Sequence, residues 1–156
     1  MQKFKILWFD DEKSNYELIK KQLEGFTIKE LNKQLDVNIQ ETFVDEEKFV
    51  ELIKDVDYSL VVTDLNLLNG ARGNLLIEFI RQHNVFVDIL LYSSNHKQLD
   101  EVTSGANFVE GIYRYALNDL GALAEKVQKV MFQVHLKEGF VIRRYELYND
   151  TLRQRH

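Results

Sequence analysis

Five short runs of hydrophobic residues recur along the chain, and each has the length of a β-strand. They cover residues 6–9, 37–43, 60–63, 87–92 and 108–113. The first, third and fourth runs are hydrophobic almost throughout, which is typical of interior strands in a parallel sheet that is covered on both faces. In the second run Val37, Ile39 and Phe43 alternate with polar residues, as expected of a strand with one wetter face.

Between the runs, hydrophobic residues recur at the spacing of an amphipathic helix. One such pattern begins near Ser14, is interrupted at Gly25 and resumes as far as Leu35. Further helices are predicted at 45–56, 75–84, 95–104 and 120–134. From Lys137 onward the pattern loosens, and we expect Gly139 to break the last helix.

The alternation of strand and helix determines the expected fold class. Repeated strand–helix units demand parallel strands joined by right-handed crossovers, and hence a three-layer α/β sandwich. The length of 156 residues falls within the range of about 100–200 residues that one domain usually holds. We therefore assign one domain to residues 1–136 and a C-terminal extension or linker helix to residues 137–156.

Composition excludes several classes of protein. The chain has no Cys, so it contains neither a disulfide scaffold nor a Cys-ligated metal site, and we expect a cytoplasmic location. The hydrophobic run at 6–9 is too short for a signal peptide or a membrane span. The net charge of −5 argues against direct nucleic-acid binding. There is no P-loop and no Gly-x-Gly-x-x-Gly motif, so no nucleotide cofactor is expected.

Polar residues end four of the hydrophobic runs. They are the pair Asp10 and Asp11, then Asp64, Ser93 and Arg114. In an open parallel sheet, ligands bind beyond the carboxyl ends of the strands. We therefore expect three carboxylates, a hydroxyl and a guanidinium to converge on one rim of the sheet.

Three carboxylates at one rim repel one another, and a divalent cation is the simplest compensation. Oxygen-only ligands favour Mg²⁺. One Asp could then attack a phosphoryl donor, with Ser93 and Arg114 contacting the phosphate oxygens. Taken singly, an Asp pair after a strand is more often a helix N-cap pair than a metal site, and Arg114 can be a solvated residue at a strand end. The recurrence at four strand ends is what points to a site.

These segments resemble the receiver domains of two-component response regulators, the CheY-like family. The resemblance rests on Lys-Ile-Leu-Trp-Phe-Asp-Asp-Glu at 5–12, on Leu-Val-Val-Thr-Asp-Leu-Asn-Leu at 60–67 and on Ile-Leu-Leu-Tyr-Ser-Ser at 89–94. The separations of Asp64 from Ser93 and Arg114 are also close to the usual ones. The likeness covers about residues 3–135. It implies a flavodoxin-like sandwich with a five-stranded parallel sheet, in the order 2-1-3-4-5, flanked by five helices.

The resemblance also implies a role for each residue of the rim. Asp64 would accept a phosphoryl group from a sensor histidine kinase or a phosphotransfer protein, and Ser93 would hydrogen-bond a phosphoryl oxygen. Arg114 stands where the family has a Lys.

Four residues would hold Mg²⁺ in such a site. Asp11 and Asp64 would bind through their side chains, Asn66 through its backbone carbonyl and Asp10 through a bridging water. We expect no chemistry beyond the chain's own phosphorylation and dephosphorylation, and hence no enzyme in the ordinary sense.

The chain departs from the family where proline is usual, because it contains none. Arg114-Tyr115 replaces the Lys-Pro pair of the last strand. That Lys-Pro bond is commonly cis, a state that costs a non-proline residue about 2.5–4 kcal/mol. We therefore expect a trans bond between Arg114 and Tyr115.

The function predicted from sequence is a phosphorelay receiver that switches protein–protein interactions. A second copy of the chain could dock through the face of residues 95–115 or through the C-terminal helix. Two alternatives stay open. One is a docking or dimerisation module that works without phosphorylation, motivated by the absent Lys-Pro. The other is a Mg²⁺-dependent phosphatase, against which stands the lack of an Asp two residues after Asp10.

Overall fold

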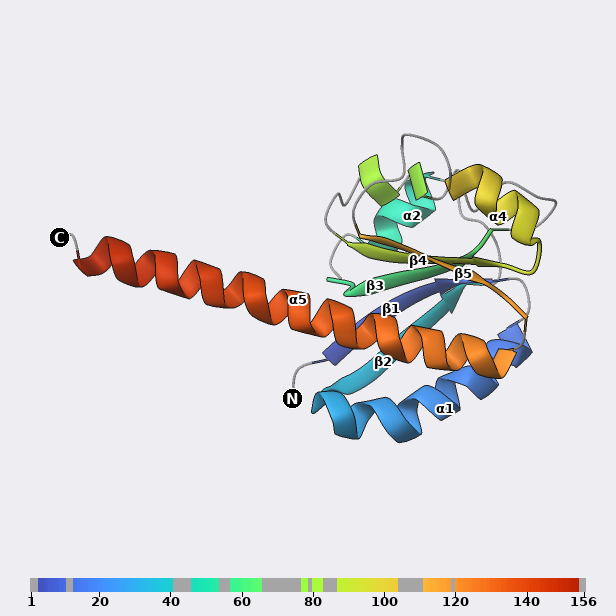
Figure 1. Ribbon diagram of the computed structural model, residues 1–156, viewed down its shortest axis with the longest axis horizontal. Helices are drawn as coiled ribbons and strands as arrows, with labels where there is room; N and C mark the ends of the chain where they lie inside the picture. The colour runs from blue at the N-terminus through green and yellow to red at the C-terminus, as the bar shows by residue number, and fades with distance from the viewer. Residues whose placement is uncertain are drawn as a thin grey trace.

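A computed structural model describes residues 3–10, 13–40, 46–53, 57–65, 77–78, 80–82, 87–103, 111–118 and 120–154 of the chain. Strands and helices alternate along it (Figure 1). The elements are β1 (Lys3–Phe9), α1 (Lys13–Leu31), β2 (Gln34–Gln40), α2 (Glu46–Ile53), β3 (Leu60–Asp64), β4 (Asp88–Ser93), α4 (His96–Thr103), β5 (Ile112–Ala116) and α5 (Leu120–Gln154). Residues 77–78 and 80–82, between β3 and β4, are also helical.

The five strands form one parallel sheet in the order β2-β1-β3-β4-β5. Helices α1 and α5 cover one face, and α2 and α4 lie on the other (Figure 1). The predicted fold class, a flavodoxin-like three-layer α/β sandwich, is therefore confirmed.

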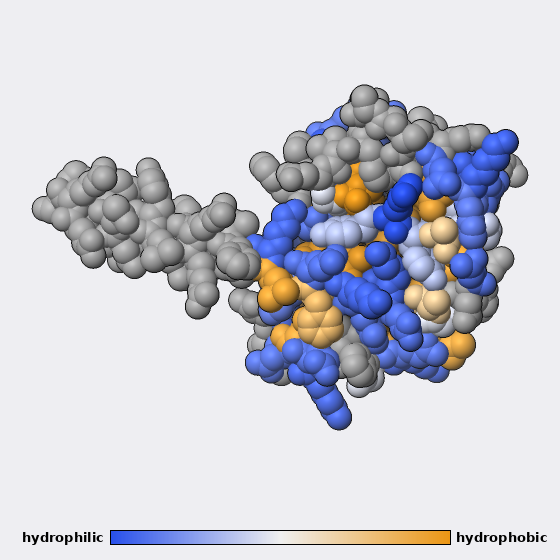
Figure 2. All heavy atoms as spheres, viewed as in Figure 1, coloured by the Kyte–Doolittle hydropathy of each residue, from blue (hydrophilic) through white to orange (hydrophobic). Residues whose placement is uncertain are grey.

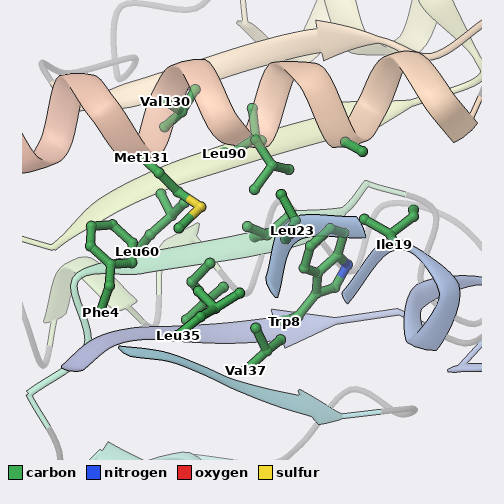
Figure 3. Close-up of a cluster of buried hydrophobic side chains, with 14 of the residues drawn as sticks. Phe4, Trp8, Ile19, Leu23, Leu35, Val37, Leu60, Leu90, Val130 and Met131 are labelled. Carbon is green, nitrogen blue, oxygen red and sulfur yellow. The ribbon is translucent and has the colours of Figure 1, made fainter. Parts of the chain in front are cut away.

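The sheet separates two hydrophobic clusters, because successive residues of a strand point to opposite faces. On one face Phe4, Ile6 and Trp8 of β1 pack with side chains of α1 and α5 (Figure 3). On the other face Leu7 and Phe9 pack with a cluster that includes Leu99 of α4. These five hydrophobic side chains of β1 are at most 1% exposed, which explains why this run is hydrophobic at every position from Ile6 to Phe9.

Helix α1 differs from its prediction. It runs without interruption through Gly25 and ends at Leu31, and Leu35 belongs to β2. A glycine inside a helix costs only about 1 kcal/mol relative to alanine. The burial of Ile19 and Leu23 against the sheet outweighs that cost. The prediction that a helix continues to Leu35 was wrong.

Strand β5 also differs, because the predicted run was 108–113 and the observed strand is Ile112–Ala116. It is one of the two edge strands of the sheet, and none of its side chains is fully buried. Gly111 precedes it with φ +86°, a conformation that favours glycine. Its carbonyl accepts a 2.8 Å hydrogen bond from the backbone N–H of Ile89. Arg114 therefore lies inside β5, and Ala116 ends the strand.

Helix α5 spans 35 residues and projects well beyond the sheet (Figure 1). The prediction that Gly139 breaks it was wrong, since one glycine is too small a penalty to end a helix fixed elsewhere by packing. Two ion pairs tie α5 to the domain where it leaves the sheet. Lys137 lies 3.1 Å from Asp88 of β4, and Glu138 lies 3.2 Å from Lys33. The predicted boundary at residue 136 stays a prediction.

The side of the domain seen in Figure 2 is mostly hydrophilic, with small groups of hydrophobic residues between the polar ones. Leu136 of α5 is one of the exposed large hydrophobic residues. Within the part of the chain that the structure describes, no helix combines the length and hydrophobicity needed to cross a bilayer.

Candidate functional site

The strand register brings the predicted site residues of β1, β3 and β4 to one rim. Phe9 is opposite Thr63, and Asp64 is opposite Tyr92. Asp10, which follows Phe9, therefore lies beside Asp64, and Ser93 ends the next strand along. Neighbouring strands lie about 4.8 Å apart, so the two carboxylates and the hydroxyl converge at the carboxyl end of the sheet.

Asp10 is buried, with an exposed fraction of 1%. Its Oδ2 accepts a hydrogen bond from the hydroxyl of Tyr92. The same hydroxyl oxygen accepts a 3.2 Å hydrogen bond from the indole Nε1–H of Trp8. The two rings meet edge to face, with centroids 6.3 Å apart and an interplanar angle of 64°. The Tyr92 hydroxyl thus orients the Asp10 carboxylate from the interior of the domain.

Asp64 is the last residue of β3 and is only partly buried. The β3–β4 pairing continues past it, because the backbone N–H of Leu65 donates to the carbonyl of Tyr92 at 2.9 Å. The backbone of Asp64 is therefore held firmly while its side chain is accessible, which is the arrangement that a reactive carboxylate requires.

Ser93 is fully buried at the end of β4. Its Oγ accepts a 3.0 Å hydrogen bond from the backbone N–H of Asn95. The Asn95 side chain in turn accepts from the backbone N–H of Gln98 at 3.1 Å and caps the first turn of α4. Ser93 thus links the rim to the start of α4.

Arg114 does not lie at the end of the last strand, where sequence analysis expected it. It pairs with Leu91 inside the sheet, and its guanidinium lies 3.3 Å from Asp100 of α4. Ala116 is the residue opposite Ser93, and the Leu117 N–H donates to the Ser93 carbonyl at 2.8 Å. The expectation failed because β5 starts later than its hydrophobic run indicated. Among the described residues there is no cis peptide bond, so the bond between Arg114 and Tyr115 is trans, as predicted.

Asp11 and Asn66, two of the four predicted metal ligands, lie outside the described residues. Within the described ranges, no group of three or more His, Cys, Asp or Glu side chains is arranged to hold a metal. The described part of the acidic rim is the pair Asp10 and Asp64. Two carboxylates at adjacent strand ends are oxygen donors of the kind that hard divalent cations such as Mg²⁺ prefer, so the donor chemistry fits such a cation.

A second polar cluster lies at the opposite end of the sheet, where β4 begins. Asp88 is 5% exposed, and its Oδ1 lies 3.1 Å from the ammonium of Lys137. Arg81 donates a 2.6 Å hydrogen bond to the carbonyl of Val87. Burial lowers the pKa of Arg81, and the charge of Asp88 opposes that shift. Burial, together with the charge of Asp88, raises the pKa of Tyr113.

The sequence pattern does not mark Tyr92 as a site residue, because it lies at the end of the hydrophobic fourth run. A tyrosine within an otherwise aliphatic interior strand was the available signal, because a buried phenol hydroxyl usually has a hydrogen-bond partner. Sequence alone does not say that the partner is Asp10.

No protein-family model matches the sequence, and no curated protein matches it. Solved structures do resemble it. A response regulator receiver domain protein from Clostridium thermocellum is 11% identical, with a TM-score of 0.60 over 88% of this chain and 98% of its own. A CheY-like receiver domain protein from Methanospirillum hungatei is 17% identical, with a TM-score of 0.58 over 86% of this chain and 98% of its own. The non-phosphorylated HemR receiver domain from Leptospira biflexa is 21% identical, with a TM-score of 0.56 over 82% of this chain and 94% of its own.

These likenesses cover nearly the whole of each solved receiver domain, and they agree with the observed strand order. At identities of 11–21% they concern the fold and not the chemistry. The chain has the fold of the response regulator receiver domains.

Proposed function

We propose that the chain is a phosphorylation-controlled signalling module in which Asp64 accepts a phosphoryl group. The observation that carries this proposal is the contrast between the two described carboxylates of the rim. Asp64 is partly exposed at the end of β3, whereas Asp10 is 1% exposed and bonded to Tyr92. A phosphoryl donor can therefore reach Asp64 but not Asp10.

In the proposed reaction a carboxylate oxygen of Asp64 attacks the phosphorus of a phosphohistidine in line. The new O–P bond forms as the P–N bond breaks, and its electron pair stays with the departing imidazole. Mg²⁺, when held by Asp10, Asp11, Asp64 and the Asn66 carbonyl, would supply positive charge to the phosphoryl oxygens. Asp10 contributes a fixed negative charge next to the attacking group, and Tyr92 keeps it in place.

Ser93 is suited to pass the modification on to α4. Its hydroxyl oxygen accepts from the Asn95 N–H in this structure. A phosphoryl group on Asp64 would give the Ser93 hydroxyl a charged acceptor, and moving Ser93 would disturb the turn that Asn95 caps. The surface that we expect to change is therefore α4 and the neighbouring β5.

Arg114 belongs to that surface. Its side chain is 58% exposed and pairs with Asp100, which is 72% exposed. A direct contact with the phosphoryl group would require the guanidinium to leave Asp100.

We propose a sensor histidine kinase or phosphotransfer protein as the cytoplasmic partner, and residues 95–115 or the C-terminal helix as the surface for a second copy of the chain.

The experiment is incubation of the full chain with acetyl phosphate, with and without Mg²⁺, followed by intact-mass spectrometry. We expect a mass increase of one phosphoryl group that depends on Mg²⁺ and is absent from Asp64→Asn. Asp57→Asn, which replaces an exposed Asp just before β3, is the matched control and should label like the wild type. Labelling of Asp64→Asn at the wild-type level would contradict the proposal.

One observation favours the second candidate function, a docking module that works without phosphorylation. Residues 116–118, at the end of β5, are Ala, Leu and Asn, so no cationic side chain stands there. A folded wild-type protein that takes no label from acetyl phosphate and binds no beryllofluoride with Mg²⁺ would favour this candidate. Turnover of an external phosphoester would instead indicate a phosphatase.

A further inference from the structure

A buried line of three side chains joins the interior of the domain to the acidic rim. Trp8 donates its indole N–H to the Tyr92 hydroxyl at 3.2 Å, and that hydroxyl donates to Oδ2 of Asp10. The exposed fractions are 1% for Trp8, 0% for Tyr92 and 1% for Asp10. Trp8 and Tyr92 belong to strands that the sheet holds in register, and Asp10 directly follows the last residue of β1, so the backbone fixes where each of the three side chains begins.

The hydroxyl of Tyr92 is a polar group in the hydrophobic core. A phenylalanine would fill the same volume between the sheet and its helices without bringing a polar group into the core, and burying a hydroxyl is unfavourable unless it is hydrogen-bonded. The group is therefore best understood through its partners, and the charged one is Asp10. A neutral hydroxyl orients a carboxylate but leaves its negative charge in place, next to Asp64.

Trp8 lies on the same side of the sheet as α1 and α5. Figure 3 shows its ring among Ile19 and Leu23 of α1 and Val37 of β2. Its only polar atom faces Tyr92. Trp8 is also the only tryptophan of the chain, so any indole signal comes from this side chain.

We propose that Tyr92 is a positioning residue of the acidic site, which fixes the Asp10 carboxylate for a divalent cation, and that Trp8 senses occupancy through the same hydroxyl. This inference rests on the proposed function, because it needs a cation at the rim. The inference goes beyond the proposed function by assigning a role to two residues of the hydrophobic core, Tyr92 and Trp8.

The first test is calorimetric titration of Mg²⁺ into the full chain and into Tyr92→Phe. Removing a group that orients a metal ligand typically weakens metal affinity about 10–100-fold, and we expect a loss in that range. The matched control is Tyr58→Phe. Tyr58 is also buried, at 8% exposure, and its hydroxyl also has a hydrogen bond, from the Asn38 amide at 3.1 Å, but it lies away from the rim.

If the role of Tyr92 were purely structural, Tyr92→Phe would have a lower melting temperature but the same Mg²⁺ affinity as the wild type, as we expect for Tyr58→Phe. Tyr92→Phe that is folded and binds Mg²⁺ within about twofold of the wild type therefore overturns the inference. Wild-type protein that binds no Mg²⁺ overturns both the inference and the proposed function, so the two failures are distinguishable.

A second measurement uses the wild type alone and holds even if Tyr92→Phe does not fold. In a ¹⁵N-labelled sample the single tryptophan gives one indole N–H resonance. We expect that resonance to shift during a Mg²⁺ titration with the dissociation constant found by calorimetry. A resonance that stays in place while Mg²⁺ binds would overturn the sensing role of Trp8 and the link through Tyr92.

Discussion

The two ends of the parallel sheet each bury an aspartate, and the two are compensated differently. At the amino end, Asp88 is 5% exposed and lies 3.1 Å from the ammonium of Lys137. At the carboxyl end, Asp10 is 1% exposed and accepts from the neutral hydroxyl of Tyr92, beside a second carboxylate, Asp64. Asp88 therefore contacts an opposite charge, whereas Asp10 lies next to a like charge.

This difference indicates that the contact at the amino end stabilises the fold, whereas the carboxyl end is a candidate binding site. An ion pair within the chain stabilises the fold and needs no further ligand, and here it attaches α5 to β4. Two carboxylates at neighbouring strand ends repel each other, and a divalent cation bound beside them would offset that repulsion. Changes at the amino end should therefore alter stability, and changes at the carboxyl end should alter ligand binding and labelling.

The largest effect on stability is expected for Gly111→Ala at the amino end. Gly111 has φ +86°, and a Cβ there would lie 2.9 Å from Oδ1 of Asp88. A non-glycine residue held in such a conformation costs about 1–3 kcal/mol. Gly25→Ala is the control, because nothing lies within 4 Å of its Cβ position inside α1, and it should stabilise by about 0.5–1 kcal/mol. Urea denaturation measures both, and equal effects would contradict the strain argument.

The next effect is expected for Asp88→Asn, which removes the charge that holds Lys137. We expect a loss of about 1–2 kcal/mol in the free energy of unfolding, toward the low end for a hydrogen bond to a charged group, because Lys137 is 54% exposed. Labelling by acetyl phosphate should be unchanged. A variant as stable as the wild type would show that the contact between Asp88 and Lys137 contributes nothing, and a loss of labelling would break the distinction between the two ends.

Asp10→Asn should give the opposite result at the carboxyl end. The amide keeps an oxygen that can accept from Tyr92 but removes the charge next to Asp64. Without Mg²⁺ we expect stability equal to the wild type or higher by up to about 1 kcal/mol, and Mg²⁺ affinity lower by at least about tenfold. Thermal denaturation with and without Mg²⁺ tests both parts. A large loss of stability without Mg²⁺ would mean that the Asp10 charge is compensated within the fold.

The smallest effect is expected for Arg114→Ala. Its partner Asp100 is 72% exposed, and such surface pairs contribute about 0–1 kcal/mol. Labelling of Asp64 should persist, because the guanidinium lies on α4 and not at the rim. Loss of labelling in a folded Arg114→Ala protein would restore Arg114 to the role that sequence analysis predicted, a contact with the phosphate oxygens.

The parts of the fold that were predictable are those that are buried on both sides. The strands β1, β3 and β4 are interior, and their hydrophobic runs end within one residue of the observed strands. β5 was misplaced because an edge strand with partly exposed side chains lacks a continuous hydrophobic run. The local sequence does not show that α1 continues through Gly25. The packing of α1 on the sheet outweighs the cost of a glycine, and that packing involves residues distant in sequence.

The candidate site was predictable only where it follows directly from strand ends. Asp10, Asp64 and Ser93 are at the rim because each ends or follows an interior strand. Arg114 was expected at the end of the last strand and lies inside β5, because its position depends on the register between β4 and β5; its role toward the phosphate stays a prediction. Tyr92 was missed because its bond to Asp10 joins residues 82 positions apart in sequence, and no local pattern encodes such a contact.

The measurement that most directly tests the central claim is the location of the modified residue in wild-type protein treated with acetyl phosphate and Mg²⁺. Borohydride reduces an aspartyl phosphate to homoserine, and peptide mass spectrometry then identifies the position. The account predicts homoserine at position 64 alone, and only in samples that contained Mg²⁺. Homoserine at another aspartate, or none in a protein shown to be folded, would contradict it.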